Sequence, residues 1–309
     1  MQPGLRRVAP RAAQLTPSEP GGRHLREKTA VIGSFAAQAL PPVDDADEAA
    51  ILCAVADEAE RSCPGTFVVE RTAAGATRID APRLGWALDE SGRLGGAGDP
   101  ALGALLAALP LALRPRALLS LAFVDDFAVI DGATATIPWL AVCLPSRWAP
   151  EKKIGRHFAE VHAPVADNEV LIAASASLAR LVTGSDRWER FVWTISADSR
   201  LDQHPGRGGV EWPGAAEADA DALVARASLR WERQTFVPIA GRSQAIFTIH
   251  VDSVPLADAV TSADAALRLH DAIASMSPAV LAYRRLDDAR DRLLAWLSAR
   301  AAAADGAPP

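Results

Sequence analysis

The chain has 309 residues, of which half are hydrophobic and 23% are charged, and its formal net charge is −6. This balance is typical of a soluble globular protein with a sizeable core, and the negative charge gives no general attraction to nucleic acid or to anionic membranes. No apolar run approaches the ~20 residues that a membrane span needs. The three cysteines form no Cys-x-x-Cys pair and leave one unpaired in any disulfide scheme, which indicates a cytoplasmic protein.

The N-terminal region is predicted to lack a sustained fold. Residues 1–46 are rich in Pro, Gly, Arg and Ala without a sustained period, so we expect a loosely ordered arm with a short ordered patch at 29–40. A helix is predicted from about Glu48 to Ser62, because it has an apolar stripe and ends at Cys63-Pro-Gly. Acidic residues favour its start: Asp44, Asp45 and Asp47.

Short strands and a broken helix follow. Residues 66–69 and 77–79 resemble strands, and 92–98 is a Gly-rich loop. Asp99-Pro100 opens a helix that is interrupted at Pro110 and resumes toward Leu121. Residues 127–130 and 137–144 are then predicted as strands.

The remainder alternates between helices and long strands. Asn168 is a candidate N-cap for a helix that reaches Val182. Alternation predicts antiparallel strands at 191–196, 228–239 and 244–251. Two final helices are predicted, at 263–276 and 278–303. Together these elements predict one α+β domain over residues 47–303, an antiparallel sheet flanked by helices, with a disordered tail at 304–309.

The most unusual chemistry lies in residues 143–165, here called the signature segment. Its apolar strand ends at Pro145, and a Ser, an Arg and a Trp follow at 146–148. Several cations and two histidines come next, and Pro164 constrains the backbone near His162. A stiffly held imidazole beside Arg and Lys suits an anionic ligand with a metal at its centre.

The signature segment reads Cys-Leu-Pro-Ser-Arg-Trp-x-Pro-x-x-Lys-Ile-Gly-Arg-x-x-x-x-Val-His-x-Pro-Val, and it resembles the haem-dependent oxidative N-demethylase alpha-subunit family. Shorter fragments match in order: Asp125-Asp-Phe127, Arg190-Phe-x-Trp193, Leu229-Arg-x-Glu-Arg-Gln-Thr235 and Phe247-Thr-Ile249. The resemblance covers roughly residues 49–297. It implies a single PAS-like haem-binding domain, haem b as cofactor and O2-dependent N-demethylation of a small amine.

The resemblance also implies roles for particular residues. His162 is the candidate iron ligand, since neutral imidazole suits iron. The candidate haem-binding residues besides it are Arg147, Trp148, Lys153, Arg156, Arg230, Arg233 and Gln234. Arg matches the carboxylates of haem because its planar fork donates two parallel hydrogen bonds. On the predicted strand, Arg230, Glu232 and Gln234 share one face and Arg233 lies on the other.

Glu232 and His250 are the candidate catalytic residues for an amine substrate. Electrons would come from NADPH through a flavin and iron–sulfur reductase in another chain, because three scattered cysteines cannot hold a four-cysteine cluster. The chain departs from the family pattern at Val192, at 124–126 and at 250–252. These departures favour the alternative of a non-enzymatic haem-binding sensor or carrier, and a haem-free interaction module is a third reading.

Overall fold

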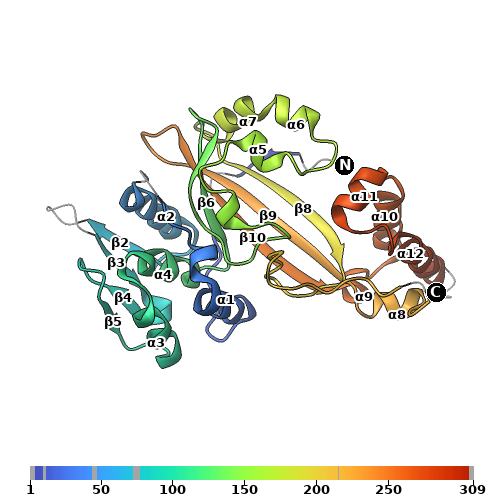
Figure 1. Cartoon of the computed structure of the whole chain (residues 1–309), viewed down its shortest axis with the longest axis horizontal. Coiled ribbons are helices and arrows are strands. Elements are labelled where there is room, and N and C mark those ends of the chain that lie inside the picture. The colour runs from blue at the N-terminus through green and yellow to red at the C-terminus, as the bar shows by residue number, and fades with distance from the viewer. Residues whose placement is uncertain (1–3, 10–11, 44–46, 72–76, 215, 306–309) are drawn as a thin grey trace.

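A computed structural model describes residues 4–9, 12–43, 47–71, 77–214 and 216–305. Two antiparallel sheets and surrounding helices give it an α+β architecture, which confirms the predicted class (Figure 1). The large sheet has the order β1 (Arg6–Arg7), β8 (Trp188–Ser196), β9 (Ser228–Pro238), β10 (Gln244–Pro255), β6 (Asp126–Asp131) and β7 (Thr136–Ala141). The small sheet has the order β2 (Val68–Arg71), β3 (Thr77–Ala81), β4 (Trp86–Leu88) and β5 (Leu94–Gly96).

The helices form three groups around the large sheet. The first group is α1 (Arg23–Ala39), α2 (Glu48–Ser62), α3 (Pro100–Ala108) and α4 (Arg114–Ala122). The second group is α5 (Phe158–His162), α6 (Glu169–Ala173) and α7 (Ser175–Val182). The third group is α8 (Ala220–Val224), α9 (Leu256–Ala259), α10 (Ala263–Ala274), α11 (Pro278–Arg284) and α12 (Arg290–Asp305). In the described part of the chain, none of these helices has the length and apolarity to cross a membrane.

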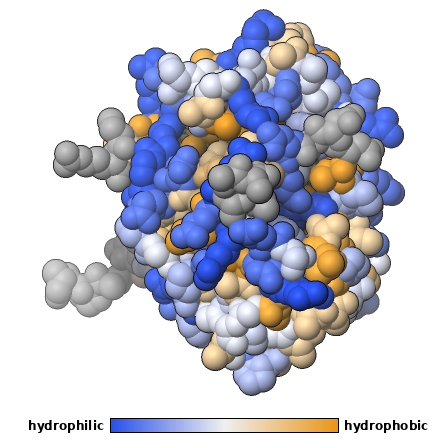
Figure 2. All heavy atoms as spheres, turned by 90° about the vertical axis from the view of Figure 1, so that its left-hand side faces the viewer, coloured by the Kyte–Doolittle hydropathy of each residue, from blue (hydrophilic) through white to orange (hydrophobic). Residues whose placement is uncertain are grey.

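Each group covers a different part of the sheet (Figure 1). The first group and the small sheet share the main core with Phe127, Trp139 and Ile246, which point to one face. Helices α5–α7 cover the opposite face, where Phe158 packs with Ile130 and Phe236. The third group packs at the far end of the long strands, and the small-sheet end of the molecule carries a mainly hydrophilic surface with scattered apolar side chains (Figure 2).

The register of the long strands divides their side chains between the two faces. Glu232 pairs with Val192 on β8 and with Val251 on β10, whereas His250 pairs with Arg233. Because side chains alternate along a strand, Glu232 and His250 lie on opposite faces. β6 pairs with β10 only through Gln244–Ile249, so the last half of β10 has no strand on that side within the described residues. There α1 takes over: Arg23 donates to the Ser253 carbonyl (2.9 Å), and His24 Nε2 lies 2.8 Å from the Val251 carbonyl.

The expectation of a loosely ordered arm at residues 1–46 needs correction, because its described part contains helix α1 and strand β1, and the ordered patch expected at 29–40 is the last part of α1. Lys28 on α1 is fully buried and pairs with Asp126 Oδ1 at 3.0 Å. Its Nζ also donates to the carbonyls of Phe123 (3.0 Å) and Asp125 (2.6 Å). The composition did not indicate the start of this helix, because its buried residue Lys28 is a cation, and a cation is buried only when distant partners satisfy it.

Most other elements follow the predictions, and two predicted helices are each divided. Helix α2 has the expected bounds and Asp47 as N-cap, while residues 44 and 45 lie outside the described residues. The helix expected over 168–182 breaks at Ala174 into α6 and α7. The helix expected over 278–303 ends at Arg285, whose left-handed φ of 56° turns the chain before α12. Of the predicted tail at 304–309, α12 includes the first two residues and 306–309 lie outside the described residues.

Candidate functional site

Residues 142–155, the first part of the signature segment with the residue before it, leave β7 and return to it, so both ends of this stretch are fixed. The Val142 N–H donates to the Ala39 carbonyl (2.9 Å), and the Arg147 N–H donates to Gln203 (3.0 Å). At the returning end the Gly155 N–H donates to the Ile137 carbonyl (2.8 Å), with a φ of 72° that favours glycine. The segment therefore delivers α5 to a fixed place above the sheet.

Helix α5 is only five residues long, and side chains from outside it hold it in place. His157 is its N-cap, since its Nδ1 accepts from the Ala159 N–H at 3.1 Å. Lys153 Nζ donates to the Val161 carbonyl (2.7 Å). Asn168, expected to cap the next helix, instead donates from Nδ2 to the carbonyls of His162 (3.1 Å) and Ala163 (2.8 Å). These contacts satisfy the terminal carbonyls of α5 and fix the backbone of His162.

The imidazole of His162 is held in one tautomer. Its Nδ1 lies 2.8 Å from the Phe158 carbonyl, which can only accept, so Nδ1 carries the proton. The ring also packs on Phe158, with 4.1 Å between ring centroids. Burial, together with the positive charges of Arg190 and Lys153, lowers the pKa of His162 to about 4. The ring is therefore neutral near pH 7, and Nε2 has no hydrogen-bond partner among the described residues.

A chain of hydrogen bonds crosses β8 and β9 on the same side of the sheet. It joins Ser146, Arg190, Arg230, Glu232 and Gln234, which we call the polar cluster. Arg190 Nε donates to Gln234 Oε1 (2.6 Å), and Gln234 Nε2 donates to Glu232 Oε2 (2.5 Å). The Ser146 hydroxyl donates to the other oxygen of Glu232 and accepts from Arg230 Nε at 2.9 Å.

The polar cluster is buried and electrically coupled to both neighbouring helix groups. Glu232 is 9% exposed and Arg230 is 1% exposed. Burial lowers the pKa of Arg190 while the charge of Glu232 opposes that change, and burial together with Glu232 raises the pKa of Tyr283 on α11. Because Arg190 also acts on His162, the cluster links α5 at one end of β8 to α11 at the other.

Two predicted haem partners are engaged with the protein's own backbone. Arg230 donates to the carbonyls of Arg200 (3.0 Å) and Leu201 (2.9 Å). Arg147 donates to the Arg284 carbonyl (3.0 Å) and to Ser196 Oγ (3.3 Å). Both guanidiniums thus connect the signature segment and β9 to the loop after β8 and to α11.

The remaining predicted residues have different surroundings. Lys153 acts on it electrostatically. Trp148 packs in the apolar cluster with Leu140 and Phe247. Arg156 pairs with Glu160 at 3.5 Å on the exposed side of α5. Two others lie on the opposite face of the sheet: Arg233, which donates to Glu189 (2.9 Å), and His250. The structure thus places Lys153, Glu232 and Gln234 on the same side of the sheet as His162 and His250 on the other side.

Sequence reasoning missed Arg190 as a site residue. It was visible only as part of the Arg-Phe-x-Trp fragment, and its importance follows from its pairing with Gln234 across the strands. Strand pairing is not encoded in the local sequence, so the only available signal was that Arg190 and Val192 have the spacing of one strand face.

The chemistry of His162 and its neighbours is compatible with an iron ligand. A neutral imidazole with Nδ1 donating to a carbonyl is the usual form of a histidine that binds metal through Nε2. Arg190 and Lys153 supply positive charge near it, which suits carboxylate groups.

Comparison with known proteins gives one family. The model described as "Haem-dependent oxidative N-demethylase, alpha subunit-like" matches residues 109–294, which is more than half of the chain. No curated protein matches the chain.

Proposed function

Because the chain belongs to the haem-dependent oxidative N-demethylase alpha-subunit-like family, we propose that it binds haem b and oxidises a small amine with O2. The observation that carries this proposal is His162, whose neutral ring keeps Nε2 unpartnered among the described residues while Nδ1 is anchored to the Phe158 carbonyl. We further propose that residues 47–303 form a PAS-like haem-binding unit, to which α1 is attached through Lys28.

His162 would hold the iron through Nε2, and the Phe158 carbonyl would keep the ring oriented. Arg190 and Lys153 would neutralise haem carboxylates. When bound, haem supplies the activation of O2, which amino-acid side chains cannot provide. The apolar residues Trp148 and Phe247 would limit the access of water.

The substrate would be held by Glu232. A small amine is a cation near pH 7, and a cation is costly to bury without a negative partner. Ser146 and Gln234 orient the two carboxylate oxygens, so the acid is fixed before any substrate arrives. Arg190 offsets part of its charge, which favours a weakly held, exchangeable cation.

The alpha-subunit description implies other subunits, and we propose that one of them supplies electrons from NADPH through flavin and iron–sulfur groups. This chain has only three cysteines, at 53, 63 and 143, and the last is fully buried. They cannot form a four-cysteine cluster site.

A haem-binding sensor or carrier is the second candidate, and it rests on Val192. This residue pairs with Glu232 and lies on the same face as the polar cluster, so its departure from the family pattern alters the proposed site. Of the departures at 250–252, His250 and Asp252 lie on the other face, whereas Val251 pairs with Glu232 and lies on the face of the polar cluster. Val192 and Val251 therefore both alter the surroundings of Glu232.

The test begins with a haem titration of the purified protein, followed by turnover. We expect one haem per chain with a Soret band, and formaldehyde release that depends on NADPH and reductase from a panel of methylated amines. Glu232→Gln should lower turnover without loss of haem. We expect dimethylamine to be a poorer substrate than another amine of the panel. Haem binding without turnover of any amine would favour the sensor or carrier, and absence of saturable haem binding would refute both.

A further inference from the structure

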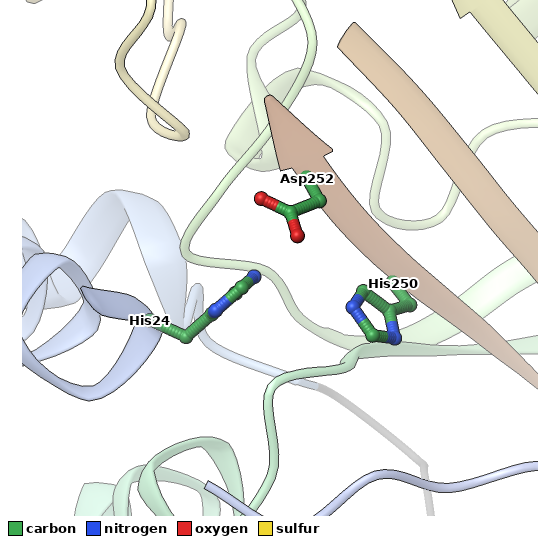
Figure 3. A group of neighbouring side chains, drawn as sticks. All are labelled: His24, His250 and Asp252. Carbon is green, nitrogen blue, oxygen red and sulfur yellow. The ribbon is translucent and has the colours of Figure 1, made fainter. Parts of the chain in front are cut away.

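A second group of possible metal ligands lies at the free edge of β10, on the face opposite the polar cluster. His24 comes from the first turn of α1, while His250 and Asp252 come from β10 (Figure 3). One potential ligand atom from each side chain lies within 4.8 Å of the others, and all three residues are half-buried. The group is therefore accessible from solvent yet enclosed by protein.

The backbone explains why these three side chains meet. His250 and Asp252 are two residues apart on one strand and project from the same face. β6 ends its pairing at Ile249, and α1 fills the vacated edge by placing His24 against the Val251 carbonyl. Figure 3 shows the carboxylate and the two rings turned toward a common space.

Other contacts orient each side chain and engage one ring nitrogen of each histidine: His24 Nε2 lies 2.8 Å from the Val251 carbonyl, and His250 Nδ1 lies 3.5 Å from Thr16 Oγ1. Asp252 Oδ1 accepts from the Ser253 N–H at 2.7 Å, which leaves its second oxygen. The His250 ring packs on Trp231, with 5.2 Å between centroids, and meets the His24 ring edge-on at 5.6 Å. Among the described residues, no hydrogen bond joins any two of the three side chains. Three donors thus converge without satisfying one another.

The local charge also permits a cation. The two neighbouring cations have their own partners, because Lys28 pairs with Asp126 (3.0 Å) and Arg233 pairs with Glu189 (2.9 Å). Asp252 then supplies the negative charge of the site.

We propose that His24, His250 and Asp252 bind one divalent transition-metal ion of the Zn²⁺ class. Two imidazoles and one carboxylate are typical ligands for such ions, whereas Ca²⁺ and Mg²⁺ prefer oxygen alone. Ligand bonds of roughly 2.0–2.2 Å require the three groups to close in slightly, with His24 Nε2 exchanging its contact to Val251 for the metal or turning Nδ1 toward it. Water completes the coordination.

The bound ion would fasten α1 to the sheet. His24 lies outside residues 109–294, so the matched family region contains only two of the three ligands. The site is independent of the proposed haem chemistry, because His162 and the polar cluster lie on the other face of the large sheet.

The test uses the full chain after removal of metal with a chelator. Calorimetric titration with ZnCl2 should give one zinc per chain, and excess zinc should raise Tm by on the order of 5 °C. Co²⁺ should give visible d–d bands from a site with nitrogen ligands. His24→Gln and Asp252→Asn should each weaken zinc binding by at least ~100-fold.

The matched control is His270→Gln, because His270 also has an adjacent carboxylate, Asp271, at 3.1 Å, but no third ligand in the group identified. It should leave zinc affinity unchanged. Because His24 is on the first turn of α1 and Asp252 is half-buried, we expect both variants to fold. Circular dichroism checks this. Equal zinc affinity in wild type, His24→Gln and Asp252→Asn, or no zinc binding by the folded wild type, would overturn the proposal.

Discussion

The two faces of the large sheet each carry a half-buried, neutral histidine, and the comparison between them separates the effect of burial from the effect of neighbours. Burial lowers the pKa of both His162 and His250 to about 4. His162 lies near a backbone carbonyl and two cations, an environment that suits binding of the iron of a haem with its carboxylate groups. His250 lies beside a second imidazole and a carboxylate, an environment for a bare cation.

The difference teaches that a low histidine pKa does not by itself identify a ligand. Burial leaves a lone pair available on both rings, and the charge of the surroundings decides what each can bind. On the α5 side the charges are positive, from Arg190 and Lys153. On the α1 side the neighbouring cations are already paired and Asp252 remains.

The largest effect is expected at His162. His162→Ala removes the only iron ligand that we assign, so the Soret band and saturable haem binding should be lost, with partial recovery in added imidazole. His250→Ala should retain haem, since that ring is on the other face. Absorption spectra of both variants check this. Loss of haem in His250→Ala alone would reverse the assignment of the two faces.

The buried ion pair of α1 should give the next largest effect. Lys28→Met leaves Asp126 buried without its partner, which typically costs ~3–5 kcal/mol of unfolding free energy. Urea unfolding measures this change. The double variant Lys28→Met/Asp126→Leu should recover much of the loss, because no charge is then stranded. A single variant as stable as wild type would show that α1 is not held by this pair.

Arg230→Ala should cost about 2–3 kcal/mol, because it removes charged hydrogen bonds to two carbonyls and to Ser146. Since Arg230 binds backbone carbonyls of the loop after β8, we expect the variant to lower the free energy of unfolding more than the free energy of haem binding. Lys152→Ala is the control. Equal haem affinities and equal stabilities for the two variants would contradict the role given to Arg230.

Acidification should destabilise the metal-free protein through both histidines. Each has a folded pKa of about 4 against an ordinary 6.5, so the unfolded state binds more protons between these values. Stability therefore falls as pH drops from about 6.5 toward about 4. Asp125, whose pKa burial raises to about 6 from 3.8, acts in the opposite direction.

Urea midpoints near pH 7 and near pH 5 measure this acid sensitivity. His162→Gln and His250→Gln should each reduce it, because glutamine does not titrate. If only one variant does so, burial does not lower the pKa of both rings equally, which would contradict the comparison of the two faces.

The smallest effect is expected at Arg156. Its pair with Glu160 is exposed on both sides, and exposed pairs contribute only ~0–1 kcal/mol. Arg156→Ala should change the free energy of unfolding in urea by less than about 1 kcal/mol. It should change the dissociation constant for haem by less than about twofold. A large loss of haem would place this residue at the site, contrary to its contact with Glu160.

The sequence alone determined the features that depend on local patterns. Helix α2 follows from its Asp47 cap and apolar stripe, and the alternation in 228–239 and 244–251 correctly placed Arg230, Glu232 and Gln234 on one face. The signature segment led to the family. These features rest on neighbours in the chain, so short-range propensity and side-chain period are sufficient to predict them.

Only the tertiary structure decided which distant residues meet. Only the last part of α1 was expected, as an ordered patch at 29–40, because Lys28 is buried by partners on β6 and the segment before it. Arg190 gained its importance from pairing with Gln234, and His24 meets His250 because β6 ends its pairing at Ile249. The physical reason is common to all three. A charged or polar side chain is buried only where a remote group satisfies it, and the local sequence does not name that group.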